Sequence, residues 1–204
     1  MIAHPPAGSR LSRLLAACLV LLGLAGCGVN EIPTREERAK AAWGEVENQY
    51  QRRADLIPNL VETVKGYAAH EKDVLEGVVR ARAAAIARPP GPDVLGDPAK
   101  FHDYEQRQME LSGALGRLLA IVENYPDLKA NQNFLQLQAE LSDIENKIAA
   151  SRRFFNNSVQ EYNSAIQQFP AVLLAGMLGF TQRGFFELDE AEKAAVNTAP
   201  SVKF

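Results

Sequence analysis

The sequence predicts an all-α protein: an elongated up-and-down helical bundle with an irregular C-terminal tail packed on it. Apolar residues recur every three or four positions over long stretches between residues 34 and 170, which is the spacing of helices that bury one side. Prolines separate these stretches from one another. The sequence before residue 170 has no sustained alternation of apolar and polar residues, the pattern of a half-buried strand. Long helices in succession favour an antiparallel bundle.

The first helical stretch is expected over residues 35–87. Thr34, with Glu37 three residues later, forms a capping box, which marks a helix start. The stretch ends at the proline-rich run at 88–92 (RPPGP), which cannot lie inside a helix. Arg53 and Glu71 are polar residues at positions of its apolar stripe, which otherwise comprises Trp43, Val46, Tyr50, Ile57, Leu60, Val64, Tyr67, Val74 and Val78.

Two further helices follow. Asp97 as N-cap and Pro98 at the first helical position start the second, which ends before Pro126. The third begins within residues 127–131 and ends before Pro170. Its broad apolar stripe is typical of a helix inside a bundle. The bundle domain is therefore expected over residues 34–170, and an apolar tail over 171–204.

The lengths of these helices do not match. An unbroken helix over residues 35–87 would be about 80 Å long, about twice the length of the second helix. Either three long helices form, with the first kinked at Pro58, or the first breaks near Asp55–Pro58 and folds back to give four. Burial of each large apolar side chain contributes about 1.5–3 kcal/mol. We therefore favour the break, which would provide Trp43 and its neighbours on the stripe with a packing partner.

The N-terminus is typical of a secretory signal. Arg10 and Arg13 precede an apolar run over residues 14–25, which is too short for a comfortable membrane span. The ending Leu24-Ala25-Gly26-Cys27 resembles the bacterial lipoprotein signal, in which the cysteine thiol is acylated, with palmitate among the acyl chains, and becomes the new N-terminus. An ordinary cleaved signal with Cys27 as a free thiol, or an uncleaved anchor, are the alternatives. We expect a signal peptide over residues 1–26 and a tether over 27–33.

This signal predicts an exported protein held on the membrane by acylated Cys27, so membrane lipid is its first expected partner. Gly28 follows the cysteine, whereas an Asp there is the familiar inner-membrane retention signal of Gram-negative lipoproteins. In a Gram-negative host the expected location is thus the outer membrane, facing the periplasm. Without the signal the chain has 20 basic and 25 acidic residues, a net charge of −5. An acidic exported protein is a poor candidate for binding nucleic acid.

The sequence lacks the usual enzymatic motifs, and we expect no cofactor and no catalytic residue. His70 and His102 are the only histidines after the signal and no cysteine accompanies them, so no metal site is expected. The candidate site residues are instead polar residues on or beside the apolar stripes. They either form a paired network between helices or contact a protein partner. These residues are Arg53, Asp55, Glu71, Asn156 and Asn163.

Three segments of the chain resemble the LemA family. They are residues 52–67 (RRADLIPNLVETVKGY), residues 125–134 (YPDLKANQNF), and residues 153–170, which include RFFNN, Tyr162-Asn163 and Phe169-Pro170. The resemblance covers nearly all of residues 35–186 and implies a helical bundle and membrane association, but no reaction. Most members resemble proteins held by an uncleaved transmembrane helix, whereas Cys27 indicates a lipid anchor here.

These observations predict a non-enzymatic envelope lipoprotein that acts as a helical scaffold or protein-interaction module with another envelope protein. An adaptor for a membrane-bound protease or an envelope-remodelling system is an alternative, and an enzyme of unspecified type is a second. Self-association is also open, because the stripe with Trp43 is covered within one chain, binds a partner or pairs with a second copy. The apolar tail from Ala171 either packs along the bundle or docks on a partner or the bilayer.

Overall fold

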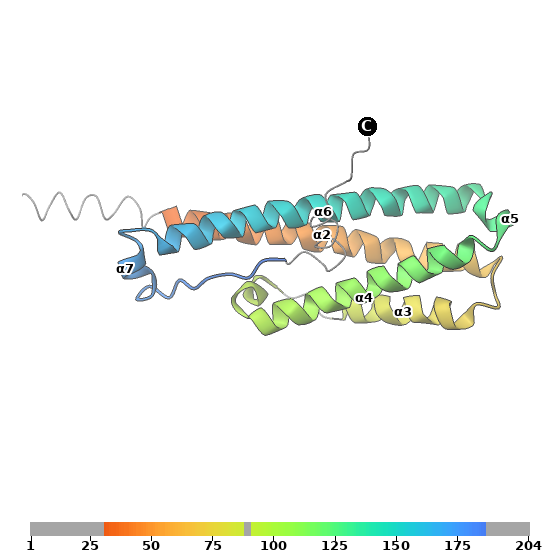
Figure 1. Cartoon of the computed structure of the whole chain (residues 1–204), viewed down its shortest axis with the longest axis horizontal. Helices are drawn as coiled ribbons and strands as arrows, with labels where there is room; N and C mark the ends of the chain where they lie inside the picture. The colour runs from red at the N-terminus through yellow and green to blue at the C-terminus, as the bar shows by residue number, and fades with distance from the viewer. Residues whose placement is uncertain (1–30, 88–90, 187–204) are drawn as a thin grey trace, which may run out of the picture.

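The computed structural model describes residues 31–87 and 91–186. The expected signal peptide, Cys27 and the last part of the tail lie outside these residues. The described chain is helical with no strand, and its long helices run antiparallel in an elongated rod (Figure 1), which confirms the predicted class. Its elements are α2 (Glu31–Lys65), α3 (Lys72–Ile86), the 3-10 helix η1 (Pro92–Gly96), α4 (Pro98–Val122), α5 (Pro126–Lys129), α6 (Gln132–Gln167) and α7 (Val172–Ala175).

The favoured break near Asp55–Pro58 is wrong. Helix α2 continues through Pro58 to Lys65, and the chain turns back at residues 66–71 instead. A proline inside a helix leaves the carbonyl four residues earlier without its usual donor. Here that carbonyl belongs to Ala54, and Nε of Arg82 in α3 donates a hydrogen bond to it at 2.6 Å. A contact from a neighbouring helix therefore compensates for the proline, and the apolar stripe continues on both sides of it.

The four-helix arrangement is nevertheless correct, because α3 folds back beside α2 after the turn at 66–71. In that turn the backbone N–H groups of Tyr67 and Ala68 both donate to the carbonyl of Val64, at 3.0 and 2.8 Å. These bonds satisfy a carbonyl at the end of α2 without adding a further helical turn. The long helices α2, α3, α4 and α6 thus alternate in direction along the rod (Figure 1).

The helix starts agree with the sequence in two of three cases. The Asp97 carboxylate accepts from the backbone N–H groups of Ala99 and Lys100, and these contacts help to lower its pKa. The Asn131 side chain caps α6 in the same way. Thr34 is not an N-cap, since the described part of α2 already begins at Glu31 and includes the last residues of the expected tether.

The extra length of α2 and α6 is covered by the tail. Helices α3 and α4 do not extend to the end of the rod where α2 begins, and the chain after α6 turns at α7 and runs back along the bundle there (Figure 1). Gly179 has a φ of 81° in this turn, a conformation that favours glycine. The tail therefore covers the part of α2 for which a break in this helix was expected to supply a partner.

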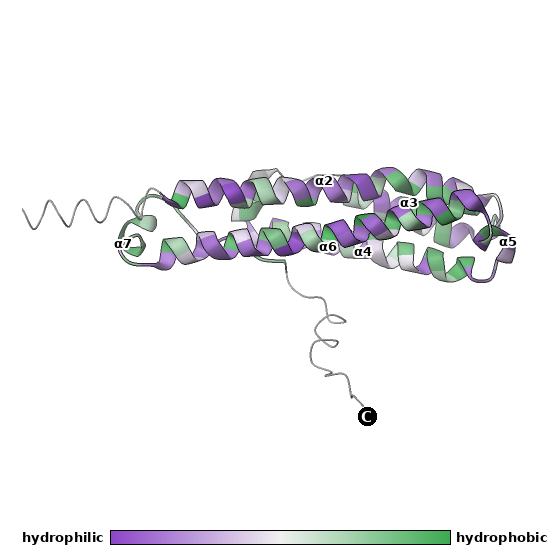
Figure 2. Ribbon diagram, turned by 90° about the horizontal axis from the view of Figure 1, so that it is seen from above, coloured by the Kyte–Doolittle hydropathy of each residue, from purple (hydrophilic) through white to green (hydrophobic). Residues whose placement is uncertain are grey.

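The core consists of three clusters arranged along the rod. Near the start of α2, Ile32 packs with Tyr162 and Ile166 of α6 and with the α7 region. An aromatic cluster around Trp43 follows, and an aliphatic cluster fills the opposite half of the bundle. Figure 2 shows the hydrophilic residues mainly on the outer faces of the long helices, as burial of one side requires.

Trp43 lies at the centre of the aromatic cluster and is 0% exposed. Rings from α4, α6 and the tail surround it, at centroid distances of 5.5 Å for Phe101, 5.5 Å for Phe155 and 5.8 Å for Phe186. All of these rings belong to the same chain. The contacts that bury Trp43 therefore require no second copy.

We predict that Trp43, the only tryptophan, emits at short wavelength in a dilute monomer and is protected from iodide. Dilution to the monomer, checked by light scattering, should change neither property. Truncation before Phe186 should shift the emission to the red, because it removes a ring that stacks on the indole. Quenchable emission that becomes protected only at high concentration would contradict this packing and favour self-association.

Candidate functional site

The middle of the rod contains a buried arginine that joins three helices. The Arg53 side chain of α2 is 1% exposed. Its Nη1 donates to Oε1 of Glu145 in α6 at 3.0 Å and to Oγ of Ser112 in α4 at 2.8 Å. Its Nη2 donates to Oε1 of Gln108, also in α4, at 2.7 Å. The charge is therefore paired and hydrogen-bonded, as a buried ion must be.

The network extends to the fourth helix and to a second ion pair. The Gln108 side-chain nitrogen donates to the carbonyl of Ala85 in α3 at 3.2 Å. On the other side Arg152 pairs with Glu105 at 3.4 Å. A cavity of about 50 Å³ lies among these groups. Because ligand pockets usually measure about 300–1,000 Å³, this cavity is too small for a metabolite, and the polar centre is a joint between helices.

The structure does not bring the five predicted site residues together. Arg53 lies in this centre, whereas Asp55 is exposed on α2 and accepts a hydrogen bond from Gln51 at 2.7 Å. Glu71 lies in the turn between α2 and α3, where it accepts from the Tyr125 hydroxyl at 2.9 Å and thereby raises the pKa of that tyrosine. These residues make separate contacts and form no common site.

Asn156 and Asn163 hold the tail against α6. The Asn163 amide nitrogen donates to the carbonyl of Arg183 and its oxygen accepts from the N–H of the same residue, both at 2.9 Å. Asn156 forms the same pair of bonds with Phe186, also at 2.9 Å. Each asparagine thus offers the tail the donor and acceptor that a neighbouring strand would offer.

The spacing of the two asparagines matches the spacing of the two tail residues. The step of seven positions along the helix from Asn156 to Asn163 rises by about 10.5 Å. The step of three positions along the extended chain from Arg183 to Phe186 advances by about 10 Å. The asparagines also lie two turns apart on one side of α6, so both face the same extended segment. Sequence spacing on the helix therefore sets the register of the tail.

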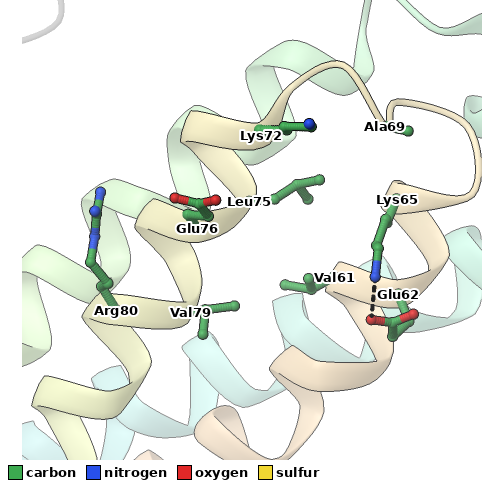
Figure 3. Close-up of a pocket in the computed structure, with 9 residues that line it drawn as sticks. All are labelled: Val61, Glu62, Lys65, Ala69, Lys72, Leu75, Glu76, Val79 and Arg80. Carbon is green, nitrogen blue, oxygen red and sulfur yellow. Dashed lines mark hydrogen bonds and ion pairs between the residues drawn. The ribbon is translucent and has the colours of Figure 1, made fainter.

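A groove lies at the opposite end of the rod, between α2 and α3. It encloses about 640 Å³. Figure 3 shows Val61 of α2 and Leu75 and Val79 of α3 directed toward the space between the two helices, with charged side chains around them. Val79 is 51% exposed. The charged residues that line the groove are Glu62, Lys65, Lys72, Glu76 and Arg80.

Sequence reasoning missed Gln108 and Ser112 as partners of Arg53. A signal for Gln108 was present, because Tyr104, Gln108 and Leu111 are spaced by four and three residues and Gln108 therefore lies on the buried stripe of α4. A polar residue at such a position needs a buried partner. Ser112 gave no comparable signal.

Glu47 is an acidic residue in a partly buried position near the core. It lies in α2 one turn after Trp43, and partial burial raises the pKa of its carboxyl to about 6. A hydrogen bond from the Trp43 side chain acts in the opposite direction but is the weaker effect. Burial penalises the charged form, so the ionised carboxylate is held at a cost at neutral pH.

Within residues 31–87 and 91–186, no group of three His, Cys, Asp or Glu side chains is arranged to hold a metal ion. No helix in the same part of the chain is long and apolar enough to cross a bilayer. The described features are thus four. A buried polar joint lies around Arg53, and Asn156 and Asn163 hold the tail. An apolar groove lies at one end of the rod and exposed apolar side chains lie at the other.

These features define an antiparallel helical-bundle protein whose polar groups hold its own segments together. The model of the LemA family matches residues 42–204, and the chain belongs to this family. It is 30% identical over 185 residues to magnetosome protein MamQ of Magnetospirillum gryphiswaldense, and 26% identical over 185 residues to magnetosome protein MamQ 2 of Paramagnetospirillum magneticum. Each alignment covers 83% of this chain and 66% of the relative, just under two thirds.

A further relative, protein LemA of Metamycoplasma hominis, is 25% identical over 170 residues, which cover 83% of this chain and 74% of that protein. The names of these relatives are not names of enzymes.

We predict that Arg53→Ala lowers the free energy of unfolding by about 3 kcal/mol, because it opens a cavity and leaves Gln108 and Ser112 without their partner. Arg53→Met should cost less, since it keeps the apolar stem. Urea denaturation measures both. Arg52→Ala is the matched control: Arg52 is the exposed neighbour, and its loss should cost no more than about 0.5 kcal/mol. An equal urea midpoint for Arg53→Ala and wild type would contradict the buried joint.

We also predict that Glu47 makes the fold less stable as pH rises through its pKa. Because this pKa is raised from 4.5 to about 6, its stabilising contribution is full below pH 4.5 and is lost as pH rises through about 6. Glu47→Gln should therefore raise the melting temperature near pH 8 by more than near pH 5. The gain in free energy should stay at or below about 1 kcal/mol, since the group is only partly buried. Exposed Glu110→Gln should show no such difference.

Proposed function

We propose that this protein is a membrane-anchored, non-enzymatic envelope lipoprotein that presents a protein-binding groove at the far end of a helical rod. The groove between α2 and α3 is the observation that carries the proposal (Figure 3). Acylated Cys27 is the anchor, and the chain is exported. In a Gram-negative host it faces the periplasm from the outer membrane. The names of the LemA and magnetosome relatives are compatible with a role outside catalysis.

The two ends of the rod have different tasks in this proposal. Cys27 lies four residues before the start of described α2, so the anchor and the first turn of α2 stay close together. Val61, at the groove, lies thirty residues further along the same helix, a rise of about 45 Å. A straight bundle anchored at one end holds the groove away from the lipid surface, where another envelope protein can reach it.

The groove suits an amphipathic helix of a protein partner. Its apolar side chains occupy the middle and its rim carries both acidic and basic groups, which favours a partner with an apolar stripe and mixed flanking charges. The antiparallel helices α2 and α3 lie side by side, and a third helix can pack along the groove between them.

Photocrosslinking tests the proposal. We predict that a photoreactive residue at Val61 or Val79, introduced in the full chain in its native membrane, labels the same protein. A photoreactive residue at Gln138, exposed on α6 away from the groove, should not label it. An excess of purified mature protein should compete for the label, and its Val79→Glu variant should not. Cys27→Ser should abolish acylation, which mass spectrometry measures.

Equal labelling from Gln138 and Val79, or labelling that the Val79→Glu protein suppresses as well as wild type does, would contradict the groove. A mature N-terminus without acyl mass would contradict the anchor. Co-fractionation with inner-membrane markers would contradict the outer-membrane location.

A further inference from the structure

Apolar side chains are exposed together at the end of the rod where α6 turns into the tail. We call residues 169–178 the apolar tip. Met177 is 84% exposed, Phe169 79% and Leu173 66%. Figure 2 shows the short helix α7 of the tip as hydrophobic ribbon at one end of the described rod. The large apolar residues exposed in the tip are Phe169, Val172, Leu173, Leu174, Met177 and Leu178.

The chain around the tip contains no charged residue. Between Glu161 and Arg183 there is no Asp, Glu, Lys or Arg, although 23% of the whole chain is charged. A surface turn in water usually carries polar or charged groups, and large apolar groups exposed in one place indicate a binding surface. The absence of charge over twenty-one successive residues is what entry into an apolar phase requires, because a buried ion is costly there.

The tip lies beside the start of α2. Ile32 is fully buried and packs with Tyr162, Ile166, Ala171 just before α7 and Ala175 at its end. Figures 1 and 2 both show α7 at the end of the rod where α2 begins. Glu31 is four positions after Cys27, a reach of no more than about 14 Å. A lipid on Cys27 therefore brings the bilayer surface within reach of the tip.

The backbone of the tip satisfies many of its own hydrogen-bonding groups. The N–H of Ala175 donates to the carbonyl of Ala171 at 2.8 Å, that of Leu178 to Leu174 at 2.9 Å, and that of Phe180 to Ala175 at 2.9 Å. Groups that are paired internally lose little when water is removed. The compact turn therefore reduces the cost of moving the tip out of water.

We propose that the apolar tip inserts into the boundary between headgroups and acyl chains of the bilayer that holds Cys27. The proposal rests on the membrane anchor of the proposed function and adds a second, protein-made contact with the lipid. Two contacts at one end of a rod restrict its tilt more than one contact does. Because the tip is uncharged, insertion should occur on zwitterionic phosphatidylcholine and should depend little on salt.

Tryptophan quenching by brominated lipid tests the insertion. In a Trp43→Phe background, Met177→Trp provides a reporter at the tip, and Val79→Trp provides an exposed reporter at the groove. The acylated full-length mature protein is placed in phosphatidylcholine vesicles with brominated acyl chains. We predict a blue shift and loss of emission for Met177→Trp at low and high salt, and neither for Val79→Trp.

A second preparation separates this inference from the anchor itself. A Cys27→Ser protein is attached to nickel-chelating lipid through a histidine tag placed at its mature N-terminus. If Met177→Trp loses emission in this preparation and the native chain proves not to be acylated, the result would support insertion of the tip and reject the acyl anchor. Adding Leu173→Glu to the reporter chain should reverse the blue shift and the quenching.

Two results would overturn the proposal. One is solvent-like, unquenched emission of Met177→Trp in both preparations. The other is a blue shift without bromine quenching, which would mean that protein covers the tip. If that shift disappears on dilution the cover is a second copy, and if it requires native membrane extract the cover is another protein.

Discussion

The Arg53 guanidinium sits where the aromatic and the aliphatic halves of the core meet. It reaches α4 and α6 directly and α3 through Gln108, so its bonds connect all four long helices. A hydrophobic core alone tolerates sliding of one helix along another, because many apolar pairs have similar energies. A slide of one turn, about 5.4 Å, would leave this charge in apolar surroundings without its partners. The arginine thus specifies the register of the bundle.

The position of the tail on α6 and the contact of α3 with α2 both follow from that register. Glu145, Asn156 and Asn163 lie on the same face of α6 or close to it, so fixing α6 against α2 also fixes where the asparagines present their amides. The tail then lies in one position and places Phe186 on Trp43. In the other direction, α3 is held so that Arg82 reaches the carbonyl that Pro58 leaves without a donor. The buried charge, the tail and the unbroken α2 are parts of one arrangement.

The rod that results differs at its two ends. The end beside the start of α2 has the uncharged apolar tip, and the other has a groove with an apolar middle and a charged rim. Charge distribution separates the two: the tip suits lipid because it lacks charge, and the groove suits protein because its rim can pair with a partner's charges. A lipid on Cys27 would place the tip close to the membrane and the groove far from it.

Much of this was determined by the sequence alone. The three-four spacing defined the helical class, the cap at Asp97 defined the start of α4, and polar Arg53 on an apolar stripe identified the buried centre, because these signals are local. The position of the first turn was not predictable in this way. Pro58 is the stronger local signal for a break, and only Arg82, distant in sequence, makes it tolerable inside α2. Likewise Asn156 and Asn163 are polar residues without assigned partners until the tail lies beside them. Which donor meets which acceptor depends on helices meeting in space, and only the tertiary structure decided it.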